Sequence, residues 1–104
     1  MFALNSSLRF YLYRGVTDMR KSFDGLCGIV QSQLDRDPTS GEVFIFINRR
    51  RDRVKLLHWQ NGGFVLYYKR LESGTFEFPS CSANDSYCQI SWQGLVMMIE
   101  GISL

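Results

Sequence analysis

The sequence contains a single histidine, His58, and three cysteines, Cys27, Cys81 and Cys88, with no Cys-x-x-Cys pair. One histidine excludes a multi-histidine metal site within one chain, and the cysteine spacing offers no Cys/His cluster in its place. An odd number of scattered cysteines predicts free thiols in a reducing cytoplasm. We therefore expect neither a metal nor a cofactor.

Long apolar runs are also missing, and the longest are far shorter than a membrane span requires. The first ten residues, MFALNSSLRF, lack the basic flank and apolar core of a signal peptide. These absences predict a cytoplasmic protein with no membrane partner. With 104 residues, 45% of them hydrophobic and 21% charged, the chain is long enough for one domain, which we assign to residues 1–104.

The middle of the chain predicts an antiparallel β-meander. Three runs rich in β-branched and aromatic residues are separated by a polar turn at 48–52 and by a turn that contains Asn61-Gly62. The three runs are Val43–Ile47, Arg53–Trp59 and Phe64–Leu71. An Asn-Gly pair favours a tight hairpin because such a turn requires positive φ angles.

The same hairpin predicts the register between the second and third runs. The pairs on one face are Trp59/Phe64, Leu57/Leu66 and Lys55/Tyr68, and those on the other are His58/Val65, Leu56/Tyr67 and Val54/Lys69. Arg53 then lies opposite Arg70, which is unfavourable unless an anion or Glu72 lies between them.

The flanking segments predict two helices and a further strand. Leu8–Arg14 alternates as a strand, and Ser22–Leu34 reads as a helix that Thr17 or Asp18 can cap. The apolar stripe of that helix comprises Phe23, Leu26, Cys27, Val30 and Leu34. We expect the stripe to be buried against Phe44, Phe46 and Leu56 or Leu57.

After the meander, Thr75–Phe78 predicts a short edge segment and Ser80–Gln89 a polar surface loop. Ser91 is a candidate N-cap for a last helix, whose inner face carries Leu95, Met98, Ile99 and Ile102. The predicted fold is α+β: a single domain with an antiparallel β-meander sheet and two helices packed on one face.

Basic charge is concentrated on the meander. Seven basic residues between Arg49 and Glu72 face two acidic ones, whereas the remainder of the chain has five basic and eight acidic residues. The seven are Arg49, Arg50, Arg51, Arg53, Lys55, Lys69 and Arg70. An antiparallel meander brings the 49–53 turn to the same end of the sheet as Lys69-Arg70, so we expect one patch that binds an anionic partner.

Two purely structural explanations compete with this hypothesis. A charged turn at the tip of a hairpin is often only solvated. Trp59, Phe64, Tyr67 and Tyr68 could stack on bases, yet several of these rings must face the core. For catalysis the sequence offers only the Asp35/Asp37 pair, which is more typical of a solvated loop than of a metal site.

Several short motifs together resemble one family, the TnpB accessory protein encoded by the second reading frame of bacterial insertion sequences of the insertion-sequence-66 type. The motifs are Asp18–Leu26 (DMRKSFDGL), Asp37-Pro38-x-Ser40-Gly41, Phe44-x-Phe46, the Arg49–Lys55 run, Trp59, Gly63-Phe64, Tyr68–Glu72 (YKRLE), Gly74, Phe76 and Pro79. His58 and the cysteine-bearing loop Ser80–Gln89 depart from the family pattern. The resemblance implies a cytoplasmic bacterial protein that assists a separately encoded transposase, and it supplies no defined biochemical activity.

The leading hypothesis is therefore a non-catalytic accessory protein of transposition that binds DNA at the ends of the element through the seven basic residues. The alternative is a protein-interaction module that docks on the transposase without contacting DNA. Its candidate contacts are Asp18, Arg20, Lys21 and Tyr68. A small nuclease is the least favoured hypothesis.

Overall fold

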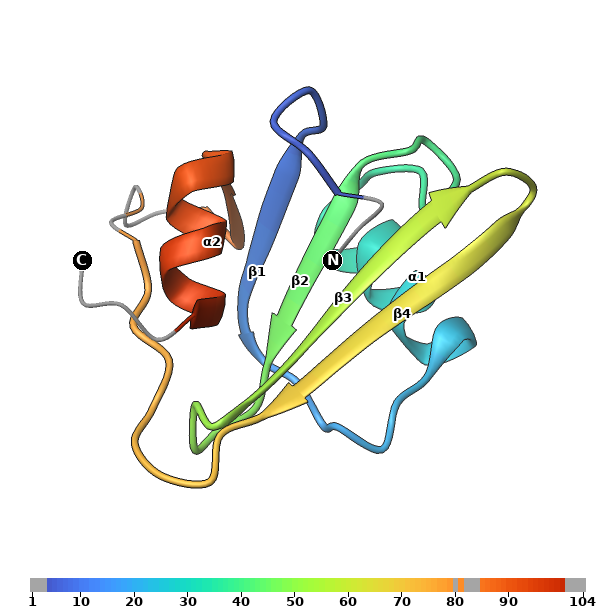
Figure 1. The fold of residues 1–104 in the computed structure, drawn as a ribbon. Coiled ribbons are helices and arrows are strands. Elements are labelled where there is room, and N and C mark those ends of the chain that lie inside the picture. Colours follow the sequence, from blue (N-terminus) through green and yellow to red (C-terminus); the bar gives the residue numbers. More distant parts are fainter. Residues whose placement is uncertain (1–3, 80, 82–84, 101–104) are drawn as a thin grey trace.

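A five-stranded mixed β-sheet with one helix on each face forms the centre of the protein (Figure 1). The computed structural model describes residues 4–79, 81 and 85–100. The elements are β1 (Phe10–Val16), α1 (Phe23–Gln33), β2 (Val43–Ile47), β3 (Arg53–Gln60), β4 (Gly63–Arg70), β5 (Tyr87–Ile90) and α2 (Trp92–Glu100). The strands lie in the order β4-β3-β2-β1-β5. The predicted α+β class is confirmed.

Strands β2, β3 and β4 form the predicted antiparallel meander. Its hairpin has the predicted register, with Trp59 opposite Phe64 and Lys55 opposite Tyr68. Asn61 has a φ of 51° and its neighbour Gly62 a φ of 81°, the positive values that a tight hairpin turn requires. The turn chemistry thus fixes which side chains share a face of β3 and β4.

Strands β1 and β2 run parallel, which corrects the expectation of an antiparallel sheet. Phe10 pairs with Val43, and Leu12 with Ile45. Helix α1 lies between these strands in the sequence, and a helical connection carries the chain back to the end of the sheet at which β1 began. The carboxyl ends of β1 and β2 therefore lie together.

The polar segment 80–89, expected to be a surface loop, contributes to the sheet through its last residues. Strand β5 pairs antiparallel with β1, and Leu12 lies opposite Cys88 while Phe10 lies opposite Ile90. Ile90 is buried, and the half-buried Cys88 packs on the same core cluster. The alternation of this short strand was hidden by the polar residues around it, four of which (80 and 82–84) lie outside the described part of the chain.

The two helices pack on opposite faces of the sheet, which corrects the expectation that both cover one face. Leu26, Val30 and Leu34 of α1 belong to one core cluster, together with Tyr11, Phe44, Phe46 and Leu57. Leu95, Met98 and Ile99 of α2 belong to the other, together with Phe10, Leu12, Val43, Ile45, Ile47, Val54, Leu56, Phe76 and Ile90. All five residues of β2 are buried, so both of its faces need an apolar cover.

The ends of α1 also differ from expectation. Phe23 is the first residue of the helix and is 42% exposed, so the buried stripe begins at Leu26 rather than at Phe23. Cys27 is half-buried. Neither Thr17 nor Asp18 caps the helix, because Ser22 occupies the N-cap position and the Asp18 carboxylate instead accepts a hydrogen bond from the backbone N–H of Arg20.

Helix α2 begins as predicted, with the Ser91 hydroxyl accepting the backbone N–H of Gly94 at 2.9 Å. Ile102, expected on the inner face of this helix, lies outside the described residues. The segment Thr75–Phe78 is not a strand, but the backbone N–H of Phe76 donates to the carbonyl oxygen of Arg51 at 2.7 Å. This hydrogen bond links the segment to the 48–52 turn, and the buried ring of Phe76 anchors the segment in the core.

Candidate nucleic-acid interface

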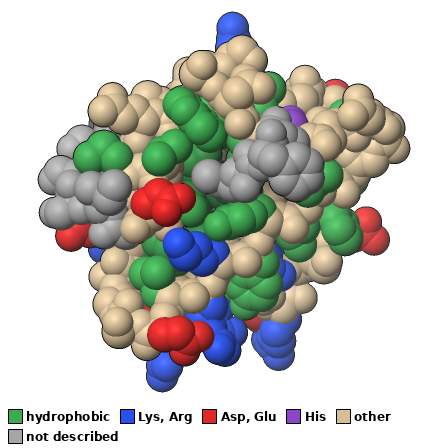
Figure 2. All heavy atoms as spheres, viewed as in Figure 1, with side chains coloured by type: hydrophobic (Ala, Val, Ile, Leu, Met, Phe, Trp, Pro, Cys, Tyr) green, Lys and Arg blue, Asp and Glu red, His purple; other side chains and the backbone are tan. Residues whose placement is uncertain are grey.

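Lys and Arg side chains gather at the end of the sheet where β1, β2 and β4 terminate and β3 begins, at the bottom of Figure 2. Arg49, Arg50 and Arg51 are exposed on the β2–β3 turn. We name this region the arginine end; it comprises Arg14, Arg20, Arg49, Arg50, Arg51 and Arg53.

Asn48 shapes the turn that carries three of these arginines. Its Oδ1 accepts the backbone N–H groups of Asp52 (3.1 Å) and Arg53 (3.0 Å), and its Nδ2 donates to the Asp52 carboxylate at 2.7 Å. This hydrogen bond from Asn48 lowers the pKa of Asp52. Asn side chains commonly fold turns in this way, and here the result is that the arginine side chains project into solvent.

Arg53 and Arg70 lie opposite each other, as the register predicted. Glu72 relieves the repulsion, because its carboxylate accepts hydrogen bonds from Arg70 Nε at 3.3 Å and Nη2 at 2.9 Å. Arg53 Nη1 lies 3.5 Å from the Tyr68 hydroxyl, at the outer limit of a hydrogen bond. Arg70 is thus exposed but partly neutralised, whereas Arg53 faces the cleft described below.

Two of the seven predicted contact residues do not join the patch. Lys55 is only 5% exposed, and its Nζ donates to the carbonyl oxygens of Met19 (2.8 Å) and Lys21 (2.6 Å). Lys69 points to the opposite face, where its Nζ donates to the carbonyl oxygen of Ile99 at 2.7 Å in the last turn of α2. An ammonium is favourable at a helix C-terminus. Both lysines therefore serve the fold.

The sequence hypothesis missed Arg14 as a member of the arginine end, and it assigned Arg20 to a different surface. The parallel pairing of β1 with β2 brings both to the arginine turn, so recognition of the β-α-β order would have found them. Arg20 is strongly exposed and forms a salt bridge with Asp18 at 2.6 Å. The hydrogen bonds from Arg20 lower the pKa of Asp18 to about 2. Arg14 Nη1 donates to the carbonyl oxygen of Asp85 at 3.2 Å.

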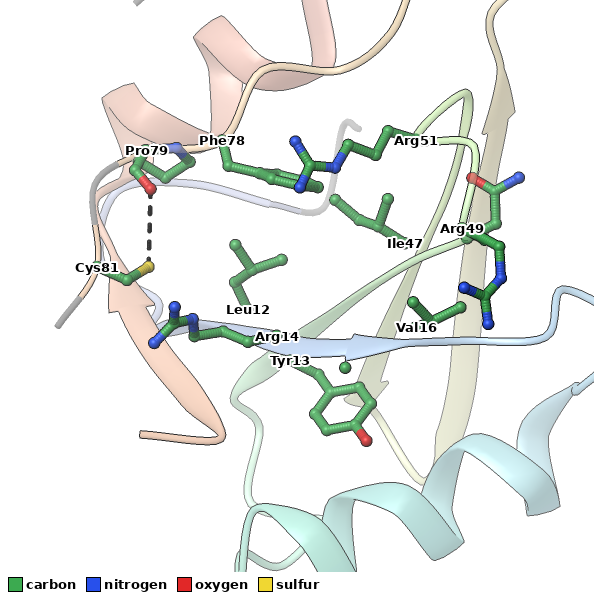
Figure 3. Close-up of a pocket in the computed structure, with 12 residues that line it drawn as sticks. Leu12, Tyr13, Arg14, Val16, Ile47, Arg49, Arg51, Phe78, Pro79 and Cys81 are labelled. Atoms are coloured by element: carbon green, nitrogen blue, oxygen red, sulfur yellow. Dashed lines mark hydrogen bonds between the residues drawn. The ribbon is translucent and has the colours of Figure 1, made fainter. Parts of the chain in front are cut away.

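Two clefts open between these arginines. The first, the Arg14–Phe78 cleft, has a volume of about 390 Å³ and includes Arg14, Arg49, Arg51 and Phe78 in its lining (Figure 3). The second, the Arg20–Arg53 cleft, has a volume of about 640 Å³ and is lined by Arg20, Arg49, Arg50 and Arg53 among others. Arg49 borders both, so the two clefts form one continuous basic surface.

The other end of the sheet has a different charge. A third cleft there, of about 580 Å³, is lined by the carboxylates of Asp35, Asp37 and Glu42 together with Arg9 and Arg36. Arg36 and Glu42 form a half-buried salt bridge of 2.6 Å, and this interaction lowers the pKa of Glu42. Within the described residues, arginines thus outnumber carboxylates at the arginine end, whereas three carboxylates and two arginines line the cleft at the other end.

The residues proposed to contact a partner protein lie next to the arginine end and share Arg20 with it. Lys55 Nζ lies 4.7 Å from the centre of the Tyr68 ring and holds the 19–21 backbone, so one buried lysine connects Tyr68 with the 18–21 turn. Tyr68 is 48% exposed and Phe23 is 42% exposed. Asp18, Arg20, Lys21 and Tyr68 are therefore brought together around Lys55.

His58 has a structural role in strand β3. It is buried, and its Nε2 lies 3.1 Å from the carbonyl oxygen of Gly41. Since a carbonyl oxygen only accepts, Nε2 carries the proton and donates. Asp37, the candidate loop carboxylate, accepts the backbone N–H and hydroxyl of Thr39. Within the described ranges, no group of three or more His, Cys, Asp or Glu side chains is placed so that it could hold a metal ion.

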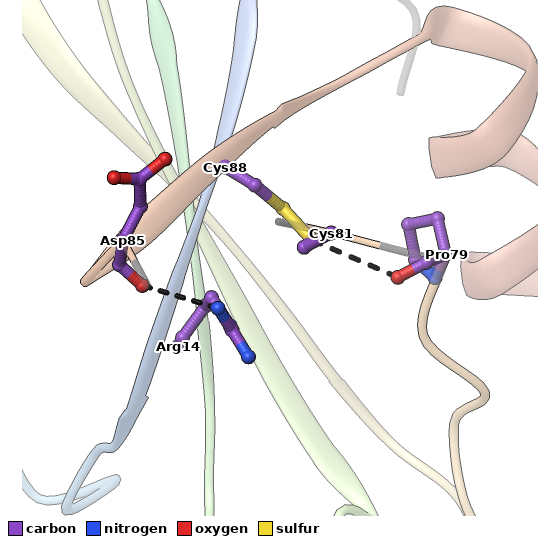
Figure 4. The surroundings of a disulfide bond; sticks show 5 residues. All are labelled: Arg14, Pro79, Cys81, Asp85 and Cys88. Atoms are coloured by element: carbon purple, nitrogen blue, oxygen red, sulfur yellow. Dashed lines mark hydrogen bonds between the residues drawn. A yellow bond between two sulfur atoms is a disulfide. The ribbon is translucent and has the colours of Figure 1, made fainter. Parts of the chain in front are cut away.

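Cys81 and Cys88 form a disulfide, which corrects the expectation that all three thiols are free (Figure 4). Their Cα atoms are 5.8 Å apart. Cys88 lies opposite Leu12 of β1, and Leu12 and Cys81 line the same cleft, a proximity that the sequence spacing did not reveal. Cys27 is free, and burial raises the pKa of its thiol. The disulfide joins the wall of the Arg14–Phe78 cleft to the outer strand β5.

Comparison with known proteins agrees with this arrangement of motifs. The model of the IS66 Orf2-like protein family matches residues 8–104. The chain belongs to the IS66 Orf2-like family. Membership indicates an accessory role in transposition.

Two curated relatives come from Sinorhizobium fredii (strain NBRC 101917 / NGR234). The uncharacterized protein y4jC is 31% identical over 102 residues, covering 98% of this chain and 86% of its own. The uncharacterized protein y4hO is 34% identical over 103 residues, covering 98% and 87%. No solved structure matches the chain. Neither helix of this IS66 Orf2-like protein is long and apolar enough to cross a membrane, within the part of the chain that the structure describes.

Proposed function

We propose that this IS66 Orf2-like protein is a non-catalytic accessory factor that binds DNA through the arginine end, in the cytoplasm and beside its transposase. The observation that carries the proposal is the convergence of six arginines from β1, the 18–21 turn and the 48–53 segment on two adjoining clefts. Guanidinium groups bind phosphates through paired hydrogen bonds, and a surface that gathers several of them suits the dense negative charge of a DNA backbone.

The proposal revises the sequence hypothesis residue by residue. The proposed DNA-binding residues still include Arg49, Arg50, Arg51 and Arg53. Arg14 and Arg20 are added to them. Lys55 and Lys69 are removed because backbone carbonyl oxygens hold their ammonium groups. Arg70 pairs with Glu72 and lines neither of the two clefts, so it is left out of the arginine end.

A salt titration tests the arginine end. Each phosphate contact contributes about 0.9 log units of affinity per log unit of salt concentration for duplex DNA. Replacing Arg49 and Arg50 with serine is expected to weaken binding and to reduce that slope by about two contacts' worth. Both side chains are exposed, so stability should change little. The measurement is fluorescence anisotropy with element-end DNA and with unrelated DNA at several salt concentrations.

Arg9→Ser provides the control for this pair. Arg9 is exposed and precedes β1, so it lies at the opposite end of the sheet, next to the carboxylate-lined cleft. Its loss lowers the net charge without removing a contact of the arginine end. Arg49→Ser and Arg50→Ser are also measured as single variants. If Arg9→Ser reduces the salt slope as much as either of them, binding depends on net charge alone and the proposal is wrong.

A second candidate function is supported by two exposed aromatic residues, Tyr68 and Phe23. Tyr68 and Phe23 expose large apolar surface next to the charged 18–21 turn, a composition that suits docking on a protein such as the transposase. Changing Tyr68 to serine together with Arg20 to serine is expected to lower transposase binding at least tenfold in a pull-down titration. Retained transposase binding by this double variant would exclude the surface as the docking site.

A further inference from the structure

The Arg14–Phe78 cleft differs chemically from the rest of the arginine end. Leu12, Val16, Ile47 and Phe78 form apolar parts of its lining, and Arg14, Arg49 and Arg51 approach from three sides (Figure 3). No Asp or Glu is among its described lining residues. A cleft with apolar walls and cationic edges suits a ligand that is flat and apolar in one part and anionic in another.

Arg51 is held in place at the top of this cleft. Its guanidinium carbon lies 4.7 Å from the centre of the Phe78 ring, a cation–π contact. Its backbone has a φ of 60°, a left-handed conformation that non-glycine residues seldom adopt. The backbone bond from Phe76 to the Arg51 carbonyl oxygen keeps this conformation. Sparsely populated backbone conformations that the surrounding structure enforces are concentrated at functional sites.

The size of the cleft limits the ligand. About 390 Å³ is near the lower end of the range for small-molecule sites, which is adequate for one nucleotide and too small for a stacked base pair. Unpaired bases stack on aromatic rings and on guanidinium planes, and arginines bind the adjoining phosphate. Arg51 with Phe78 provides the stacking surface, and Arg14 with Arg49 provides cations beside it.

We propose that the Arg14–Phe78 cleft binds one unpaired nucleotide of a DNA strand, with the base against Arg51 and Phe78 and the phosphate at Arg14 and Arg49. This inference rests on the proposed DNA binding and specifies its substrate as DNA that has a single-stranded end next to a duplex. The neighbouring Arg20–Arg53 cleft then serves the duplex backbone.

The test compares a blunt duplex with the same duplex carrying a four-nucleotide single-stranded tail, by fluorescence anisotropy at fixed salt. The wild-type protein is expected to bind the tailed DNA about tenfold more tightly, because stacking of one base contributes on this order. Phe78→Leu removes the ring but keeps most of its volume, so it should abolish the preference for the tail, with a much larger loss of affinity for the tailed DNA than for the blunt duplex. Urea unfolding of each variant verifies that it is folded.

Phe64→Leu is the matched control. Phe64 is a half-buried ring near the start of β4, at the other end of the sheet, and it packs against Trp59 rather than an arginine. This change should keep the tenfold preference. Equal binding of blunt and tailed DNA by the wild-type protein would overturn the inference and leave DNA binding at the arginine end intact. An equal loss on both DNAs in Phe78→Leu would also overturn it, whereas no binding to either DNA by the wild type would refute the proposed function itself.

Discussion

Phe76→Ala is expected to lower the free energy of unfolding by about 3–5 kcal/mol, the usual cost of truncating a fully buried phenylalanine. Phe76 is 1% exposed and belongs to the core cluster beneath α2, although it lies in a segment without regular secondary structure. Its backbone N–H also holds the Arg51 carbonyl oxygen. The ring therefore anchors both the 71–79 segment and the arginine turn, and urea unfolding measures the loss.

Phe23→Ala is the matched control for that truncation. The sequence placed Phe23 in the buried stripe of the first helix, yet Phe23 is 42% exposed at the first position of α1. Its truncation should cost about 1 kcal/mol or less. If Phe76→Ala is too unstable to purify, Phe76→Leu gives a milder change in the same direction. Equal losses for Phe23→Ala and Phe76→Ala would contradict the burial that distinguishes them.

The sequence predicted the meander well because the information it needs is local. The Asn61-Gly62 turn and the period-two alternation of β3 and β4 determine the register, and all the predicted pairs are present. The same register already placed Lys55 with Leu57 on one face and Lys69 with Leu56 on the other. Lys55 and Lys69 both lie toward the same end of the sheet, but they point to opposite faces and therefore cannot form one patch.

The arrangement of β1, β5 and the helices depends on contacts between distant segments, and there the sequence patterns were ambiguous. An alternating strand such as Leu8–Arg14 reads the same in a parallel and in an antiparallel sheet. The fully apolar sequence of β2 indicated that both faces of the sheet are covered, but it did not indicate which helix covers which face. The position of Arg14 at the arginine end follows only once β1 is known to be parallel to β2.

Lys55→Met is expected to lower the stability of the fold without changing its affinity for DNA. Methionine keeps the apolar stem of the side chain and removes the ammonium that holds the carbonyl oxygens of Met19 and Lys21. Two charge-assisted hydrogen bonds and the contact with Tyr68 are lost. The relief of burying a charge offsets part of this loss, so a net decrease of about 2 kcal/mol is expected.

The loss should be local and should not reach the arginine clefts. Amide hydrogen exchange is expected to rise in residues 19–22, and binding to transposase should weaken if the 18–21 turn is the docking surface. The slope of DNA affinity against salt should stay unchanged because Lys55 is only 5% exposed and two carbonyl oxygens hold its ammonium. Lys69→Met, which releases a single carbonyl oxygen on the other face, should leave exchange in residues 19–22 at its wild-type level. A salt slope reduced by about one contact in Lys55→Met would instead return this lysine to the DNA-binding surface.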